Sequence, residues 1–229
     1  MIEPILNNRY TEQQYMKQFW AGKLVQCMRK MGELHTNAVL LSLDGAKQIK
    51  PYQHYPESAY TFGGGDWKIF YHSHPSPDNE TLEHGHFHFF TRTDRAEGDP
   101  DSISTSAEWS HVIAMGMNEL GQPTRLFTTN LWVTDGEWFN PELSQQPFNK
   151  LRDSDEDDLS STWFKYLLLI FEREIEWLIS ERDRVVRQHY PDHQDQCYTD
   201  RSIYYLSSLD INLNEKLIEV FQPACQETS

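Results

Sequence analysis

Residues 83–90 read Glu-His-Gly-His-Phe-His-Phe-Phe, and residues 71–75, shortly before them, read Tyr-His-Ser-His-Pro. Five of the ten histidines of the chain lie in these two stretches. The histidines within each stretch are two residues apart, and side chains two apart share one face of a β-strand. Residues 84, 86 and 88 therefore face one way, and the phenylalanines at 87 and 89 face the other, towards a core. We predict two neighbouring strands that direct imidazoles from both into one small volume.

This cluster predicts a metal site, because neutral imidazole is the commonest protein ligand of Zn, Fe, Cu and Ni. Neighbouring strands lie about 4.8 Å apart, so imidazoles from both reach one ion at about 2.1 Å. We expect a divalent ion, with zinc or iron preferred, and His72, His74, His86 and His88 as its ligands. The alternative is a half-exposed sheet whose histidines are polar surface residues.

Five imidazoles do not fit comfortably around one ion, so at least one acts from outside the ligand set. Glu83, His84 and His111 are the candidate catalytic or supporting residues, with Glu83 or a leftover histidine as general base. An open multi-histidine site suits metal-assisted hydrolysis, and with Fe(II) it suits oxygen chemistry. A non-catalytic metal- or ligand-binding protein is the hypothesis from another class, so the sequence leaves enzyme and binding protein both open.

A later strand carries three candidate substrate-binding residues. Arg125 is placed to attract an anionic small molecule, and Thr129 and Asn130 offer a hydroxyl and an amide to a ligand. The alternatives are a surface charge for Arg125 and a turn whose polar side chains satisfy the backbone for Thr129 and Asn130.

The periodicity on either side of the cluster predicts an α+β fold with an antiparallel sheet, either a meander or a partial barrel. We divide the chain into residues 1–150, with the sheet and the histidines, and a helical C-terminal part, 151–229, packed on the same domain. No regular element is predicted for 50–66, residues 38–43 are either a strand or a helix end, and 94–108 is a loop. The predicted elements are an N-terminal helix at 10–32, strands at 67–74, 84–93, 109–117 and 124–134, a long helix at 160–189 starting after Ser160 or Ser161, and shorter helices at 200–208 and 213–221.

Composition narrows the function classes. Twenty basic and 35 acidic residues give a formal charge of −15, which disfavours nucleic acid and anionic membranes as partners and leaves a small molecule. Three widely spaced cysteines suggest neither a disulfide framework nor a cysteine zinc finger. The N-terminus has no signal-peptide pattern, and the longest apolar run, 166–171, is too short to span a bilayer. We therefore expect a soluble cytoplasmic protein.

Three local resemblances accompany these motifs. The segment 71–75 resembles the motif of JAMM-type zinc isopeptidases, although Glu83 and His86 stand where that family has a serine and an aspartate ligand. The segment 84–90 resembles the signature of histidine-triad nucleotide hydrolases, which implies that His86 attacks an α-phosphate without a metal. Here Gly85 replaces a hydrophobic residue and no glycine-rich phosphate loop follows. The paired histidines also resemble those with which cupins hold iron or manganese.

A fourth resemblance extends over nearly the whole chain. The runs 83–88, 111–115, 125–134 and 200–211 together look like an uncharacterised bacterial family known as a domain of unknown function. The resemblance implies no activity. It places seven residues in one motif set: His84, His86, His88, His111, Thr129, Asn130 and Trp132.

Overall fold

The computed structural model describes residues 3–74, 83–92, 109–140, 142, 145–191 and 194–222; the predicted loop at 94–108 lies outside them. Its centre is an open six-stranded sheet in which all neighbouring strands are antiparallel and follow one another in chain order. The predicted α+β class with an antiparallel sheet is confirmed. The strands are β1 (Tyr55–Phe62), β2 (Trp67–His72), β3 (Gly85–Arg92), β4 (Trp109–Met117), β5 (Pro123–Thr129) and β6 (Tyr205–Asp210).

Eight helices of four or more residues flank the sheet in the described part of the chain. The N-terminal helix is confirmed and already includes Glu3, and residues 38–42 are helical rather than extended. The helices are α1 (Glu3–Glu33), α2 (Ala38–Ser42), α3 (Leu131–Thr134), α4 (Gln145–Asp153), α5 (Leu159–Ile170), α6 (Glu172–His189), α7 (Gln194–Thr199) and α8 (Leu213–Phe221).

Two edge strands were not expected from the sequence. Strand β1 occupies part of the segment 50–66, for which no element was predicted, and β6 takes the place of the C-terminal part of the helix predicted at 200–208. The helix prediction was wrong because this segment pairs with β5. Its buried Ser207 is satisfied by hydrogen bonds, which a pattern of apolar residues does not reveal. Its hydroxyl donates to the Leu178 carbonyl oxygen (2.8 Å) and lies 2.7 Å from the Thr128 hydroxyl.

Two predicted boundaries also differ. The strand predicted to continue to residue 134 ends at Thr129, because the Asn130 side chain caps α3 by accepting from the Leu131 amide. The long helix predicted at 160–189 is divided at Phe171, whose φ and ψ of −99° and 10° leave the helical region. The N-cap of its first half is Asp158, which accepts from the Ser161 amide, and not Ser160 or Ser161.

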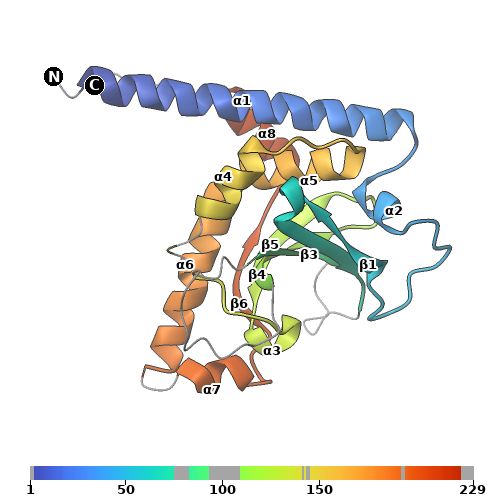
Figure 1. Cartoon of the computed structure of the whole chain (residues 1–229), viewed down its shortest axis with the longest axis vertical. Helices are drawn as coiled ribbons and strands as arrows, with labels where there is room; N and C mark the ends of the chain where they lie inside the picture. Colours follow the sequence, from blue (N-terminus) through green and yellow to red (C-terminus); the bar gives the residue numbers. More distant parts are fainter. Residues whose placement is uncertain are drawn as a thin grey trace.

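One face of the sheet packs on helices. Phe87 and Phe89 of β3 contact Phe164 of α5, with ring centroids 4.9 and 5.7 Å apart. Figure 1 shows α1 lying across one end of the molecule with α5 and α8 beneath it, while α6 runs along the side and α3 and α7 lie at the opposite end. Because Phe87 and Phe89 face α5, the histidines that alternate with them along β3 lie on the face away from α5.

None of the helices within the described ranges is long and apolar enough to cross a membrane.

Strand register determines which side chains meet on that second face. His72 pairs with His86, and Phe70 pairs with His88, across β2 and β3. Directly paired residues of antiparallel strands share a face. The β3–β4 register shifts between Phe89 and Phe90, so that His111 becomes the partner of Phe90. Three strands thus contribute histidines to one face.

Candidate metal centre

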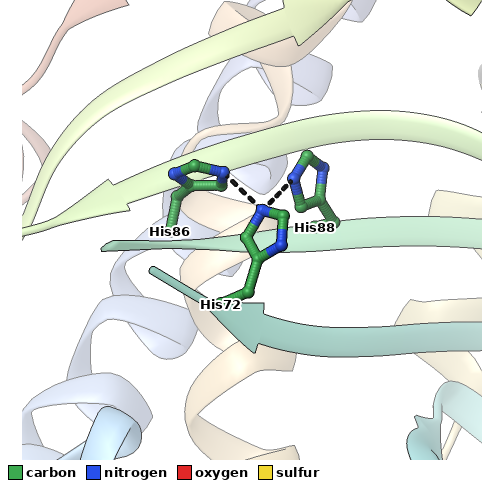
Figure 2. Close-up of side chains that lie close together, drawn as sticks. All are labelled: His72, His86 and His88. Atoms are coloured by element: carbon green, nitrogen blue, oxygen red, sulfur yellow. Dashed lines mark hydrogen bonds between the residues drawn. The ribbon is translucent and has the colours of Figure 1, made fainter. Parts of the chain in front are cut away.

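Three histidines converge at the end of β2 and the middle of β3. The Nε2 atoms of His72 and His86 lie 2.7 Å apart, and those of His72 and His88 lie 3.1 Å apart. In Figure 2 the three imidazoles stand on the same side of the strands and point towards one another. Each offers one nitrogen to a group in which all ligand atoms lie within 4.8 Å of one another. This is a distance range in which three ligands can share an ion.

The three imidazoles are neutral at physiological pH. His86 and His88 are only 4% and 1% exposed. Burial lowers the pKa of both well below 6.5, with neighbouring histidines acting in the same direction. The pKa of His72 falls to about 3, first through burial and then through His74 and His54. Neutral imidazole is the form that binds a metal, so these ligands need no deprotonation.

Hydrogen bonding alone does not satisfy this arrangement. A neutral imidazole has one N–H and one lone pair. His72 Nε2 faces two other Nε2 atoms, so a single proton or lone pair at that atom serves one of them well and the other poorly. A cation accepts all three lone pairs at once.

A second line of contacts runs from His88 away from the cluster. Its other ring nitrogen, Nδ1, lies 3.0 Å from His111 Nε2, and His111 Nδ1 lies 3.4 Å from the Thr129 hydroxyl oxygen. All three side chains are buried. Burial, followed by the charge of Arg182, lowers the pKa of His111 to about 3. Two residues predicted for catalysis and substrate binding are therefore connected to a candidate ligand.

His74, the fourth predicted ligand, lies beside the group of three and not within it. Its ring centroid is 5.1 Å from that of His72 and 5.0 Å from that of His86. Its Nε2 lies 3.3 Å from the Tyr204 hydroxyl, and Tyr52 stacks on its ring at 5.3 Å. His74 is thus adjacent to the cluster with its Nε2 directed to a phenol.

Glu83 and Arg125 are joined to each other. Arg125 donates from Nε to Oε1 (2.5 Å) and from Nη2 to Oε2 (3.0 Å) of Glu83, and both side chains are less than 10% exposed. Gly116 provides the space for the Glu83 side chain, because a Cβ at this position would lie 2.2 Å from Glu83 Oε1. The predicted base and the predicted anion-binding group therefore form one buried ion pair.

His84 and Asn130 make contacts outside the cluster. His84 Nδ1 lies 2.8 Å from the hydroxyl of Tyr71, a residue of the face that packs on α5. Asn130 is fully buried, and its Nδ2 donates to the carbonyl oxygens of Cys197 (2.8 Å), Ile203 (3.2 Å) and Asp200 (3.3 Å). These contacts anchor the chain around α3.

Two neighbours of the site were not identified from the sequence. The His54 ring stacks on Phe70 at 3.9 Å and lies 5.5 Å from His72. Tyr204, next to β6, reaches His74. His54 has no second histidine two residues away, and Tyr204 lies in a segment predicted to be helical. The spacing of residues in the sequence therefore did not indicate that either lies near the site.

Comparison with known proteins places these residues in a family. No curated protein and no solved structure matches the chain significantly. A family described as "Domain of unknown function (DUF6969)" matches residues 19–211, which include every residue of the candidate centre. The chain belongs to this DUF6969 family.

Proposed function

We propose that the protein binds one divalent transition-metal ion through the Nε2 atoms of His72, His86 and His88, with zinc or iron as the preferred ion. The observation that carries this proposal is the convergence of three neutral, largely buried imidazoles whose lone pairs no hydrogen-bond pattern satisfies together. Nitrogens bound to one ion at about 2.1 Å lie about 3.0–3.4 Å from each other. The separation of 3.1 Å between His72 and His88 already meets that requirement, and the separation of 2.7 Å between His72 and His86 needs only a small outward movement.

The number of ligands supports a catalytic site. Structural zinc sites generally have four protein ligands, whereas catalytic sites have three and an open position. When bound, an ion with an open position acts as a Lewis acid towards water or a substrate oxygen. We propose that the protein hydrolyses a small molecule in a metal-dependent reaction. His74, which lies outside the ligand set, would act as the general base that accepts a proton from water. Tyr204 would orient His74 through the contact at its Nε2.

One observation favours a second, non-catalytic function. The His74 ring lies at nearly equal distances from His72 and His86, so a rotation of its side chain would supply a fourth nitrogen. A closed four-histidine site of that kind would hold a structural metal. The histidine-triad alternative has less support, because His84 is bound to Tyr71 and not to His86.

Location and partners are part of the same proposal. Cys27 and Cys197 are both free and buried, as expected for a protein of a reducing compartment, and we propose a cytoplasmic location. The formal charge of −15 supports a small-molecule partner over nucleic acid.

Metal content tests the central proposal. Untagged protein purified without chelators or added metal should contain close to one equivalent of a transition metal by ICP-MS. His86→Ala should remove it, while His189→Ala, at the exposed end of α6, should retain it. Wild-type protein that neither carries nor takes up zinc or iron would contradict the proposal.

A cobalt-loaded sample separates the two functions. Azide should shift the visible absorption bands of the cobalt-loaded protein if a coordination position is open, and His74→Ala should keep the metal. Bands insensitive to azide, together with loss of metal in His74→Ala, would establish the closed four-histidine site instead.

A further inference from the structure

We propose that His111 and Thr129 form a positioning device that holds His88 in the tautomer able to bind metal, and so set the metal affinity of the site. The inference rests on the proposed function, since it concerns a ligand of that same centre. His111 lies beside His88, on the side of its ring away from the other two ligands. Its Nε2 lies at Nδ1 of His88, the nitrogen on the side of the ring away from the cluster, at 3.0 Å. His111 is therefore placed to act through His88.

The chain of contacts has two possible directions. In the first, His88 Nδ1–H donates to His111 Nε2, and His111 Nδ1–H donates to the Thr129 hydroxyl oxygen. His88 Nε2 then carries a lone pair directed at the cluster. In the second, the Thr129 hydroxyl donates to His111, His111 Nε2–H donates to His88 Nδ1, and the proton of His88 resides on Nε2. Only the first direction leaves His88 free to bind an ion, because a protonated ring nitrogen has no lone pair to offer.

The surroundings fix the geometry of this chain. The bulge between Phe89 and Phe90 brings His111 opposite Phe90, whose ring centroid is 5.2 Å from that of His111. Thr129 is the last residue of β5 and is held in place by the cap that Asn130 provides to α3. Both His111 and Thr129 are buried, at 7% and 3% exposure, so bulk water does not readily replace either contact. Contacts of this kind beyond the ligands generally control metal affinity by 10–100-fold.

Matched variants test the hydrogen bonds against mere packing. His111→Phe fills the space without an acceptor, whereas His111→Gln offers an amide oxygen near the position of Nε2. Thr129→Val removes the hydroxyl with little change of shape, and Thr129→Ser retains it. Zinc affinity is measured by competition with a chromophoric chelator, and the thermal unfolding of each metal-free variant reports its fold.

We expect His111→Phe to weaken zinc binding by about 10–100-fold and His111→Gln to restore most of that loss. Thr129→Val should weaken it by a smaller factor, and Thr129→Ser should match wild type. Long-range ¹H–¹⁵N spectra of the zinc-loaded wild-type protein should show the His88 proton on Nδ1. This readout needs no variant, so the inference stays testable even if His111→Phe does not fold.

Three results would overturn the inference while leaving the metal site intact: unchanged affinity in His111→Phe, equal losses in His111→Phe and His111→Gln, or a His88 proton on Nε2 in the zinc-loaded protein. Wild-type protein that takes up no zinc would instead overturn the proposed function itself, and this inference with it.

Discussion

His72 and His86 stand directly opposite each other in the β2–β3 ladder, and their Nε2 atoms lie 2.7 Å apart. His88, two residues further along the same face of β3, contributes the third nitrogen. Regular strands, not loops, thus hold all three imidazoles. Sites on such elements are more rigid than sites on loops. The register of one antiparallel pair is therefore sufficient to assemble the proposed ligand set.

The buried histidines make the stability of the metal-free protein depend on pH. The pKa values of His72 and His111 are about 3 in the folded chain and near 6.5 when unfolded. Below about pH 6.5 the unfolded chain takes up these protons first, so the free energy of unfolding falls as the pH decreases towards 3. Each such histidine adds a slope of about 1.4 kcal/mol per pH unit within that window. Above pH 6.5 the effect is absent.

The variant His111→Gln removes one of these titrating groups, so its comparison with wild type measures the contribution of His111 alone. Urea unfolding with EDTA present, at about pH 4 to pH 6, should give a pH slope shallower than wild type by about 1.4 kcal/mol per unit. Carboxylates titrate in both proteins and cancel in the difference. Identical slopes would show that His111 is protonated in the folded state.

The ion pair between Glu83 and Arg125 should contribute to stability. Arg125→Met leaves the Glu83 carboxylate buried without a partner, which costs about 3–5 kcal/mol of the free energy of unfolding. Glu33→Gln is the matched control, because its ion pair with Arg29 has side chains 54% and 77% exposed, and should cost less than about 1 kcal/mol. Chemical denaturation measures both. Equal, small losses would argue that Arg125 is free to bind a ligand.

Asn130 should also contribute to the stability of the fold. Asn130→Ala removes the cap of α3 and the donor to three carbonyl oxygens, and we expect a loss of about 2–4 kcal/mol. Folded protein should still take up metal, with no more than the small loss of affinity expected for Thr129→Val, because Asn130 contacts none of the three histidines and acts on them only through Thr129. A stable variant with impaired ligand binding would instead support the substrate-binding role predicted from the sequence.

Gly85 should matter to the position of His72. A Cβ at Gly85 would lie 2.4 Å from the Tyr71 hydroxyl and 2.6 Å from the His72 carbonyl oxygen, so Gly85→Ala forces β2 and β3 apart. We expect a loss of about 1–3 kcal/mol and weaker zinc binding. Gly22→Ala, in α1 with open space around it, should instead stabilise the protein by about 0.5–1 kcal/mol. Thermal unfolding of both variants distinguishes the two, and equal shifts would contradict the steric argument.

The sequence predicted the central strands because their two-residue periodicity is strong on both faces. The edge strands lack it. Strand β1 has a register irregularity and buries only its two end residues, and β6 buries serine through hydrogen bonds. A periodicity of apolar residues cannot detect either pattern.

The cluster itself was predictable, whereas the partners of its members were not. Alternation places His72, His86 and His88 on one face of neighbouring strands, and the β2–β3 register brings them together. The contact of His111 with His88 depends on a bulge, and that of Glu83 with Arg125 depends on a side chain crossing over Gly116. The tyrosine contacts of His74 and His84 likewise join segments that are distant in sequence or on another face. Such contacts depend on tertiary packing, so no local pattern in the sequence predicts them.

An anomalous diffraction map of zinc-loaded crystals, collected at the zinc edge, would locate the bound ion itself. We expect one strong peak about 2.1 Å from each of the Nε2 atoms of His72, His86 and His88. A peak bound by other residues, or no peak in this cluster at saturating zinc, would contradict the proposed ligand set.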